Sequence, residues 1–421
     1  MRTDIPTPDL APLRNGFPAL QRTLAGAPCI FADAPGGTQV PDQVIDAMAR
    51  YLREHNANSG GAFLSSEETD ATIAAARDAA ADFLGCNSHE IVFGGNMTTL
   101  AFALSRSLAR RLQPGDEVVV TRLDHDANIA PWIAAAEDAG AAVRWVDFTS
   151  EDCTLDLASL DAALSPQTRV VAFALASNAV GTISRAHEVI RRARETEALV
   201  IADAVHFAPH RIIDVGALDV DVLFCSPYKF FGPHLGVMFA RAELLDGLRP
   251  YKVRPSHDES PDRWETGTMN HEALAGFIAT IDYIARLGRE DGGAAGEGRR
   301  AEVVAGMEII RRAERALSEA FLEGLPSVPG ARLYGIGETA RADERTPTFA
   351  ISLGGRHPRD VAAELGARGI FVWDGNYYAL ALMERLGLEE SGGAVRIGFC
   401  HYNTTDEVEQ VLEELERLGR R

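Results

Sequence analysis

The sequence predicts an α/β protein in which a large domain, built on a mainly parallel sheet, precedes a smaller α+β domain. Three observations lead to this prediction. Helical patterns alternate with short apolar runs between about residues 70 and 245. Those runs are apolar almost throughout, which predicts strands whose two faces are both covered by helices. A polar, glycine-rich stretch over residues 288–304 then separates this pattern from the rest of the chain.

Strands that alternate with helices predict βαβ units, in which parallel strands are joined through helices packed on the sheet. The expected helices contain, in chain order, DATIAAARDAAADFLG, LAFALSRSLARRL, IAPWIAAAEDAG, LASLDAAL and AHEVIRRARETE. The expected strands contain EIVFGG, DEVVVT, AAVRWVDF, RVVAFALAS, ALVIADAV, DVLFCS and GVMFAR.

The chain after the glycine-rich stretch predicts a long amphipathic helix, AEVVAGMEIIRRAERALSEAFLEGL, and a smaller unit. Expected strands of this unit are TFAISLGG, GIFVWDG and AVRIGFC, and its last helix is DEVEQVLEELERLG. We therefore expect three parts. An N-terminal segment over residues 1–24 packs with the small domain, the large domain covers residues 25–288, and the small C-terminal domain covers residues 289–421.

Composition and charge exclude several classes of function. The 421 residues carry a formal net charge of −20, which argues against nucleic acid or an anionic membrane as the main partner. No apolar run approaches the ~20 residues that cross a bilayer, and the first residues contain no signal-type apolar region. The five cysteines show no paired or metal-ligand spacing. We therefore expect a cytoplasmic protein without a bound metal.

Polar side chains with chemical roles follow the expected strands, at the edge where open parallel sheets bind their ligands. The segment GGNMTT opens a helix after a strand, and a helix N-terminus with nearby hydroxyls can bind phosphate. The side chains that follow later strands are His125, Asn178, Asp203, His206, Ser226, Tyr228 and Lys229.

This set suits pyridoxal phosphate (PLP). The cofactor needs a lysine for its Schiff base, an anion site for its phosphate and a carboxylate that keeps its pyridine nitrogen protonated. Lys229, the segment GGNMTT and Asp203 would meet these needs, and the flat ring of His125 can stack on the cofactor. A covalently occupied amine also explains why Lys229 follows an apolar strand, where a free ammonium group would be unfavourable.

Two other functions fit the sequence less well. A nicotinamide-dependent dehydrogenase needs a G-x-G-x-x-G fingerprint after its first strand, which GGNMTT does not supply. A non-catalytic relative that keeps the fold as a binding module predicts loss of the lysine or the aspartate, and the sequence retains both.

The chain also resembles the class V aminotransferases, the fold-type I group of PLP enzymes that includes cysteine desulfurases and selenocysteine lyases. The motifs that carry this resemblance are FADAPGGTQVPDQVIDAM, LDHDANIAPW, SNAVGT, ADAVH, SPYKFFGPHLG and VRIGFCHYNTTDEVEQVL. The resemblance spans nearly the whole length. It implies a seven-stranded, mainly parallel sheet flanked by helices in a large PLP-binding domain.

The resemblance implies catalytic roles for three residues. Lys229 would form the internal aldimine, Asp203 would face the pyridine nitrogen, and His125 would stack on the ring. The full cofactor-binding set that it implies is Met97, Thr98, His125, Asn178, Asp203, His206, Ser226, Tyr228, Lys229 and Thr268. Within this set, Met97, Thr98 and Ser226 would hold the phosphate with Tyr228 nearby, and His206 would approach the phenolic oxygen.

Substrate and subunit contacts follow from the same resemblance. Asn178 would lie over the ring hydroxyl and the substrate, and Arg396 would pair with the substrate carboxylate through two hydrogen bonds. Thr268, in RWETGTMN, would reach the phosphate of a neighbouring subunit. A homodimer with shared active sites is therefore expected.

Departures from the family pattern bear on the reaction. Cysteine desulfurases carry a reactive cysteine on a loop of the small domain, but the corresponding stretch GIFVWDGNYYALALME contains none. Trp373 and Tyr378 stand where an arginine and that cysteine are expected, so both are predicted to contact the substrate. Tyr228 replaces a histidine before the lysine, and PGGT replaces an alanine-rich N-terminal motif.

The sequence therefore predicts a PLP-dependent enzyme that acts on an amino acid or amine through a Lys229 aldimine and a carbanion. The favoured reaction is that of a desulfurase-like C–S lyase, which works by β-elimination without a protein persulfide. Transamination and amino-acid epimerisation stay open, because both also pass through a carbanion.

Overall fold

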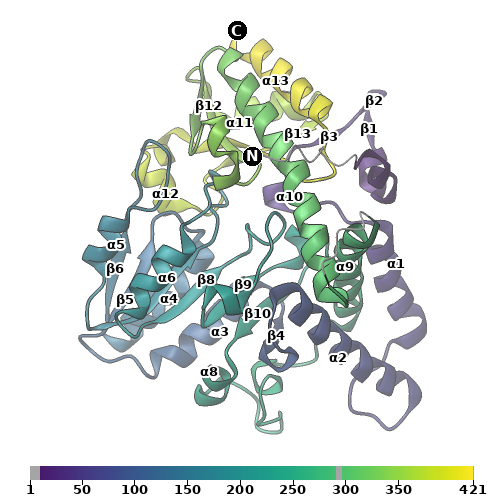
Figure 1. Cartoon of the computed structure of the whole chain (residues 1–421), viewed down its shortest axis with the longest axis vertical. Helices are drawn as coiled ribbons and strands as arrows, with labels where there is room; N and C mark the ends of the chain where they lie inside the picture. Colours follow the sequence, from purple (N-terminus) through teal and green to yellow (C-terminus); the bar gives the residue numbers. More distant parts are fainter. Residues whose placement is uncertain (1–9, 291–295, 421) are drawn as a thin grey trace.

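The computed structural model describes residues 10–290 and 296–420. Figure 1 shows a large α/β unit and, above it, a smaller unit that carries the C-terminal helix α13 (Thr405–Gly419). The long helix α10 (Arg299–Gly324) connects the two units, because it packs along α9 (His271–Glu290) and also contacts α13.

A seven-stranded sheet with the order β4-β10-β9-β8-β7-β5-β6 forms the centre of the large unit. Its strands are β4 (Ile91–Gly94), β5 (Glu117–Thr121), β6 (Ala142–Val146), β7 (Thr168–Ala174), β8 (Leu199–Asp203), β9 (Val222–Cys225) and β10 (Gly236–Ala240). Only β10 runs antiparallel to its neighbours, so the sheet is mainly parallel, as the sequence predicts.

Helices cover both faces of this sheet. In β5, Val118 and Val120 belong to one buried cluster with α3 and α4, whereas Val119 belongs to a second cluster with α2 and α9. Successive side chains of a strand point to opposite faces, so a strand between two helical layers needs apolar residues at every position. This requirement explains the continuous apolar runs of the sequence.

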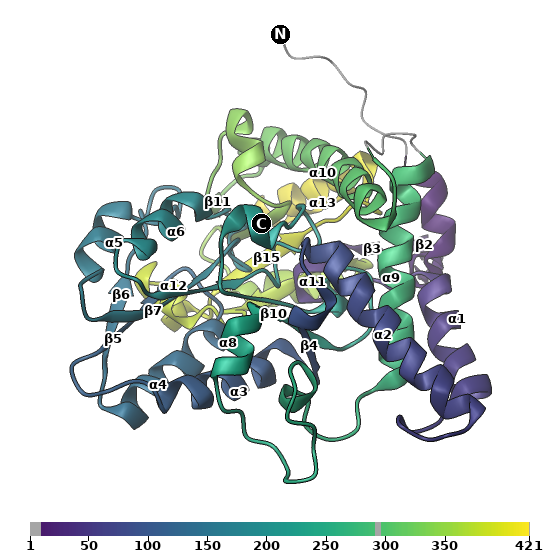
Figure 2. The same ribbon diagram turned by 60° about the horizontal axis from the view of Figure 1, so that its bottom comes forward.

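The helices of the large unit are α1 (Asp42–Arg50), α2 (Leu64–Leu84), α3 (Met97–Ala109), α4 (Ala130–Ala139), α5 (Leu157–Ala163), α6 (Ala186–Arg194), α7 (Val215–Leu218), α8 (Ala242–Gly247) and α9. Figure 2 shows α1, α2 and α9 side by side at one flank of the sheet, with α3 and α4 below it.

The small unit contains a four-stranded antiparallel sheet in the order β11-β12-β15-β14. Its strands are β11 (Ala331–Tyr334), β12 (Thr348–Leu353), β14 (Trp373–Gly375) and β15 (Ala394–Gly398), and its shorter helices are α11 (Pro358–Gly366) and α12 (Leu380–Arg385). The helices α10, α11 and α13 bury a third apolar cluster against this sheet.

One predicted strand of the small unit is wrong. The run GIFVWDG forms two short strands, because its two ends pair with different partners. Its first part, β13 (Ile370–Phe371), pairs in parallel with β3 (Ile30–Phe31), whereas β14 pairs with β15. The change of partner turns the chain towards the large unit, so that residues 373–378 line one cavity together with Asp203 and Lys229 of the large unit.

The described part of the N-terminal segment contacts the C-terminal residues. The Arg14 guanidinium lies 2.6 Å from a Glu407 carboxylate oxygen of α13, and the Phe17 ring packs against Tyr402. Residues 1–9 of the predicted 1–24 segment lie outside the described residues. The predicted division at residues 24 and 288 stays a proposal.

Within residues 10–290 and 296–420, no helix combines the length and the apolar character that crossing a bilayer requires.

Candidate active site

The predicted site residues meet in one cavity of about 870 Å³ at the carboxyl ends of the strands. Every residue of the predicted set lines this cavity except Thr268. The members that line it are Met97, Thr98, His125, Asn178, Asp203, His206, Ser226, Tyr228, Lys229, Trp373, Tyr378 and Arg396. Residues from both units therefore face a single space.

Lys229 ends a short 3-10 helix (Pro227–Lys229) directly after β9. Its Nζ donates a hydrogen bond to the Pro35 carbonyl oxygen and lies 4.9 Å from the centre of the Tyr228 ring. Burial, the largest cause, and the Arg396 charge together lower the pKa of Lys229 to about 7, against the opposing effect of Asp203. The amine is therefore partly neutral near pH 7, and a neutral amine is the form that attacks an aldehyde.

The small number of lysines in the chain supports Lys229 as the residue that forms the Schiff base. The sequence contains only two lysines, Lys229 and Lys252, among 41 basic residues. Lys252 lies in a loop, where its Nζ is 3.0 Å from an Asp258 carboxylate oxygen. Lys229 is thus the one lysine that lines the cavity.

Asp203 is the last residue of β8, and only 5% of it is exposed. Its carboxylate accepts a hydrogen bond of 2.8 Å from the Val205 backbone N–H. Burial raises the pKa of Asp203 to about 6, against the lowering effects of Val205 and Lys229. A buried carboxylate of this kind favours a cationic partner, such as a protonated ring nitrogen.

His125 follows β5 and caps the short helix Asp126–Asn128, where its Nδ1 accepts a 3.0 Å hydrogen bond from the Ala127 N–H. Burial, the largest cause, and the charges of Lys229 and Arg396 together lower the pKa of His125 to about 4. The imidazole is therefore neutral near pH 7, so its flat ring can stack on a cofactor without carrying charge.

Arg396 and Asn178 belong to different units and are joined by a hydrogen bond. The Arg396 Nη1 donates a 2.9 Å hydrogen bond to the Asn178 carbonyl oxygen, and the guanidinium lies 4.3 Å from the centre of the Tyr377 ring. Two buried atoms of this pair, Arg396 Nε and Asn178 Oδ1, have no hydrogen-bond partner within the described residues. Unpaired buried polar atoms are costly, so both are suited to a ligand in the cavity.

The N-terminus of α3 lies at the same cavity through Asn96, Met97 and Thr98. The Asn96 side chain caps this helix by accepting a 2.8 Å hydrogen bond from the Thr99 N–H. The first N–H groups of a helix have no partners inside it, and the helix dipole favours negative charge there. Ser226 lines the same cavity, and this end of the helix can bind a phosphate.

Two predicted residues, His206 and Thr268, differ from the others in their contacts or their position. His206 lines the cavity, but its Nε2 lies 3.1 Å from the Thr346 Oγ1, and burial lowers its pKa well below the ordinary value. Thr268 lines a separate cavity of about 420 Å³ together with Gly94 and Gly95. Its predicted role in a neighbouring site stays a prediction.

The loop after β14 closes one side of the cavity. Tyr377 and Tyr378 both have left-handed backbones, with φ of 57° and 58°, which is unfavourable for residues with bulky side chains. Three hydrogen bonds hold this turn. The Tyr377 and Tyr378 carbonyls accept from Asn178 Nδ2 (2.9 Å) and the Asp126 N–H (2.7 Å), and the Tyr378 N–H donates to Asn376 Oδ1 (3.1 Å).

Sequence reasoning missed some residues of the site. Gly36, Phe102 and Asp126 also line the cavity. Asp126 could have been found, because it follows His125 directly. Gly36 belongs to the PGGT motif. The sequence shows that this motif departs from the family pattern, but it does not indicate what Gly36 does. Nothing in the local sequence indicated Phe102, which is brought to the cavity by the packing of α3.

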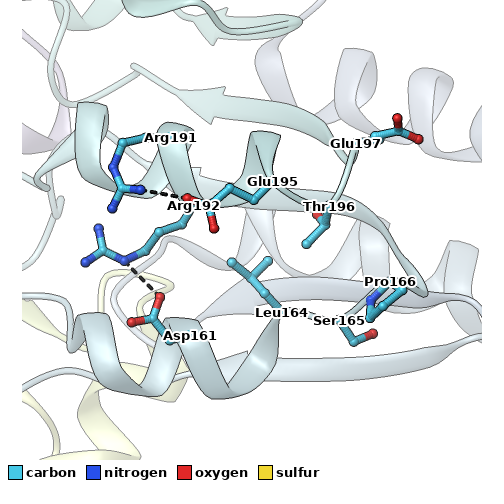
Figure 3. Close-up of a pocket in the computed structure, with 9 residues that line it drawn as sticks. All are labelled: Asp161, Leu164, Ser165, Pro166, Arg191, Arg192, Glu195, Thr196 and Glu197. Carbon is cyan, nitrogen blue, oxygen red and sulfur yellow. Dashed lines mark hydrogen bonds and ion pairs between the residues drawn. The ribbon is translucent and has the colours of Figure 1, made fainter.

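A second hollow, of about 790 Å³, lies between α5 and α6 (Figure 3). Its residues precede β7 and β8, so it lies at the amino ends of the strands, away from the site described above. Arg191 and Arg192 are paired with Glu195 (2.7 Å) and Asp161 (2.8 Å). Both arginines are thus already neutralised by exposed neighbours, and the hollow is a charged surface feature.

The cavity at the carboxyl ends meets each need of PLP. It has a lysine with a lowered pKa, a buried carboxylate, a neutral flat imidazole, a helix N-terminus for the phosphate, and unpaired Asn178 and Arg396 atoms for a bound ligand. Together with the mainly parallel seven-stranded sheet, these residues define a PLP-dependent enzyme of fold type I. More specifically, the chain belongs to the class-V aminotransferase family, whose model matches residues 30–411.

Named relatives and solved structures agree with this family. The chain is 32% identical over 430 residues to a probable cysteine desulfurase of Streptomyces coelicolor and 31% identical over 424 residues to a cysteine desulfurase of Pectobacterium atrosepticum, with 97% of each chain covered in both pairs. The apo structure of a cysteine desulfurase from Thermococcus onnurineus superposes with a TM-score of 0.84 and 28% identity, over 93% of this chain and 95% of the other. The predictions of fold class, family and cofactor are confirmed.

Proposed function

We propose that the enzyme breaks the Cβ–S bond of a sulfur-containing amino acid by β-elimination, without passing sulfur to a protein cysteine. The observation that carries this proposal is the lining of the cavity, which includes Lys229 and Arg396 but none of the five cysteines. The desulfurase names of the relatives support the choice of a C–S bond.

Three of the cysteines, Cys225, Cys86 and Cys153, are unsuited to nucleophilic attack. Cys225 ends β9 only four residues before Lys229, yet it is 1% exposed, and burial raises the pKa of its thiol far above the ordinary value. Burial also raises the pKa of Cys86 and Cys153 to about 12. Since the thiolate is the reactive form, these side chains stay unreactive near neutral pH.

Arg396, Asn178 and Lys229 have different roles in the proposed reaction. Bound PLP supplies the electron sink for the electron pair released when the Cα–H bond breaks. Arg396 holds the substrate carboxylate, because it remains cationic although burial lowers its pKa to about 10. Asn178 offers its unpaired Oδ1 to the substrate amine or the cofactor. Lys229 Nζ, with its lowered pKa, takes the proton from Cα and can return one to the leaving sulfur.

A balanced reaction needs only water in addition. The Cβ–S bond breaks with both electrons on sulfur, and the sulfur leaves as a thiolate or hydrosulfide that takes up a proton. The remaining 2-aminoacrylate is hydrolysed by water to pyruvate and ammonium. No oxidant and no thiol acceptor is required, in keeping with a cavity that contains no thiol.

The test is to incubate the holoenzyme with L-cysteine and S-methyl-L-cysteine and to measure thiol or sulfide, pyruvate, ammonium and alanine. Equal amounts of thiol and pyruvate are expected. Treating the enzyme with iodoacetamide, and removing the reagent before the substrate is added, should not change these amounts. Alanine together with a protein persulfide would contradict the proposal. Amino-group transfer to an added 2-oxo acid would instead identify an aminotransferase, and loss of optical activity without cleavage would identify an epimerase.

The proposal includes a homodimer in which Thr268 completes the partner's phosphate site. The position of Thr268 outside its own cavity supports this arrangement. Mixing two inactive variants, Lys229→Ala and Thr268→Ala, should restore activity, because each mixed dimer then contains one site with an intact Lys229 and an intact Thr268. No recovery on mixing would show that each chain completes its own site. A cytoplasmic location is also proposed, and the five unpaired cysteines support it.

A further inference from the structure

Two departures from the family pattern, PGGT and Trp373, form one structural feature. A methyl group built on Gly36 would lie 2.0 Å from the Trp373 Nε1 and 2.7 Å from its Cε2. The indole therefore occupies space that only a glycine at position 36 leaves free. The preceding residue, Pro35, accepts the hydrogen bond of Lys229, so this contact lies next to the reactive amine.

Trp373 is also placed beside the predicted carboxylate-binding residue. In the small sheet, Trp373 of β14 stands directly opposite Arg396 of β15. Residues opposite each other in an antiparallel pair lie on the same face of the sheet, with their Cβ atoms about 4.5–5.5 Å apart. An amino acid whose carboxylate is bound by Arg396 therefore has its side chain within reach of the indole.

The aromatic rings around this place are open to the cavity. Trp373 is 48% exposed and Tyr378 is 72% exposed, although both are large and partly apolar. Tyr378 uses one face to stack on His125, and Phe102 also lines the cavity. The volume of about 870 Å³ lies in the upper part of the range for small-molecule sites, roughly 300–1,000 Å³. PLP takes up part of this volume, and the part bordered by Trp373, Tyr378 and Phe102 offers flat surfaces to the side chain of a substrate.

We propose that the substrate is an S-substituted cysteine with a flat, unsaturated group on its sulfur, and that Trp373 is the residue that selects this group. This inference rests on the proposed C–S cleavage. It also explains how the enzyme works without a thiol in the cavity, because an aromatic thiolate is a stable leaving group that needs no acceptor.

The reaction of such a substrate is balanced in the same way as above. The Cα–H proton goes to Lys229 Nζ, and the Cβ–S bond breaks with its electron pair on sulfur. The thiolate leaves as the free thiol after it takes up a proton, and water converts 2-aminoacrylate to pyruvate and ammonium. For S-phenyl-L-cysteine the products are thiophenol, pyruvate and ammonium.

The first measurement compares kcat/KM for S-phenyl-L-cysteine and S-methyl-L-cysteine with the holoenzyme. We expect a preference of at least about tenfold for the phenyl compound, the size of effect that one aromatic contact and its buried area produce. Trp373→Ala should remove most of this preference, whereas Trp373→Phe should keep much of it.

Gly36 provides a second variant, because the three atoms nearest to a methyl group added there all belong to the Trp373 indole. Gly36→Ala should lower the preference as Trp373→Ala does, and Gly36→Ala combined with Trp373→Ala should be no worse than Trp373→Ala alone. Gly366→Ala is the matched control, since a methyl group there meets no atom within 4 Å. Additive losses in the double variant would overturn the contact as the cause of selectivity.

A binding measurement separates this inference from the proposed function. L-Homophenylalanine and L-norvaline replace the sulfur of the two substrates by a methylene group, so neither can release a thiol. Calorimetry should show at least about tenfold tighter binding of homophenylalanine, lost in Trp373→Ala. Equal affinities, with both S-substituted cysteines cleaved alike, would overturn the inference and leave the proposed function standing. Tight homophenylalanine binding without release of thiophenol would overturn the C–S cleavage itself, and the assignment of an S-substituted cysteine with it.

Discussion

The imidazole of His125 and the phenol of Tyr378 stack with their ring centres 5.5 Å apart and their planes 24° apart. His125 belongs to the large unit and Tyr378 to the small one, so this pair joins the two units at the cavity. One face of the imidazole is thus covered by protein. Two hydrogen bonds from the large unit also hold this loop: the Asp126 N–H donates to the Tyr378 carbonyl oxygen, and Asn178 Nδ2 donates to the Tyr377 carbonyl oxygen.

The His125 pKa tests this relationship. Tyr378→Ala should raise the pKa of His125 from about 4 towards its ordinary value near 6.5, because burial is the main cause that lowers it. Tyr378→Phe keeps the stacked ring and should leave the pKa low. Titration of the histidine resonances by NMR, assigned through His125→Asn, measures the shift. An unchanged pKa in Tyr378→Ala would show that other groups bury the imidazole.

Lys229 should govern the uptake of PLP by the apoprotein. Because burial lowers the pKa of Lys229 to about 7, the neutral amine accumulates as the pH rises through 7. The rate of PLP incorporation, followed by absorption, should therefore rise between pH 6 and 8 and level off above. Lys229→Ala should incorporate none covalently, and Lys252→Ala should behave as the wild type. Mass spectrometry after chemical reduction must find the cofactor on residue 229; a label on Lys252 would refute the assignment.

Asp203 should support catalysis without supporting the fold. Asp203→Asn removes the negative charge that faces the predicted ring nitrogen, while an amide oxygen can still accept the Val205 hydrogen bond. We expect kcat to fall at least about 100-fold, with an unchanged circular dichroism spectrum. The pKa of Asp203 is raised to about 6, so the wild-type rate should also fall as the pH drops below 6 and the carboxylate is protonated. A variant rate within a few-fold of wild type would exclude an electrostatic role.

Asn376 should act as a positioning residue for the loop. Its Nδ2 lies 3.0 and 3.2 Å from the two Glu389 carboxylate oxygens, and its Oδ1 accepts from the Tyr378 N–H. Asn376→Ala leaves the two left-handed tyrosines without this support, and should cost about 1–3 kcal/mol of unfolding free energy and raise KM more than it lowers kcat. Urea unfolding and steady-state kinetics measure these effects. Glu389→Gln keeps one acceptor oxygen and serves as the mild control, so equal losses in the two variants would argue against the hydrogen bonds as the cause.

Much of the fold and of the site could be predicted because the relevant signals are local. Continuous apolar runs such as DEVVVT reflect burial on both faces of the sheet. Lys229 and Asp203 were predicted as a pair because parallel strands place their carboxyl ends at one edge. Their pKa values could not be predicted, since the low pKa of Lys229 depends on burial and on Arg396, which is 167 positions later in the sequence.

The amino-acid sequence by itself determined the layers of the protein, the edge at which its chemistry takes place and the cofactor that suits it, because periodicity and strand order are properties of short segments. Only the tertiary structure decided how GIFVWDG divides between two sheets, how Gly36 makes room for Trp373, and which face of His125 is covered by Tyr378. The contacts of β13 with β3, of Gly36 with Trp373 and of His125 with Tyr378 join residues more than 250 positions apart, and no local pattern shows that such residues meet.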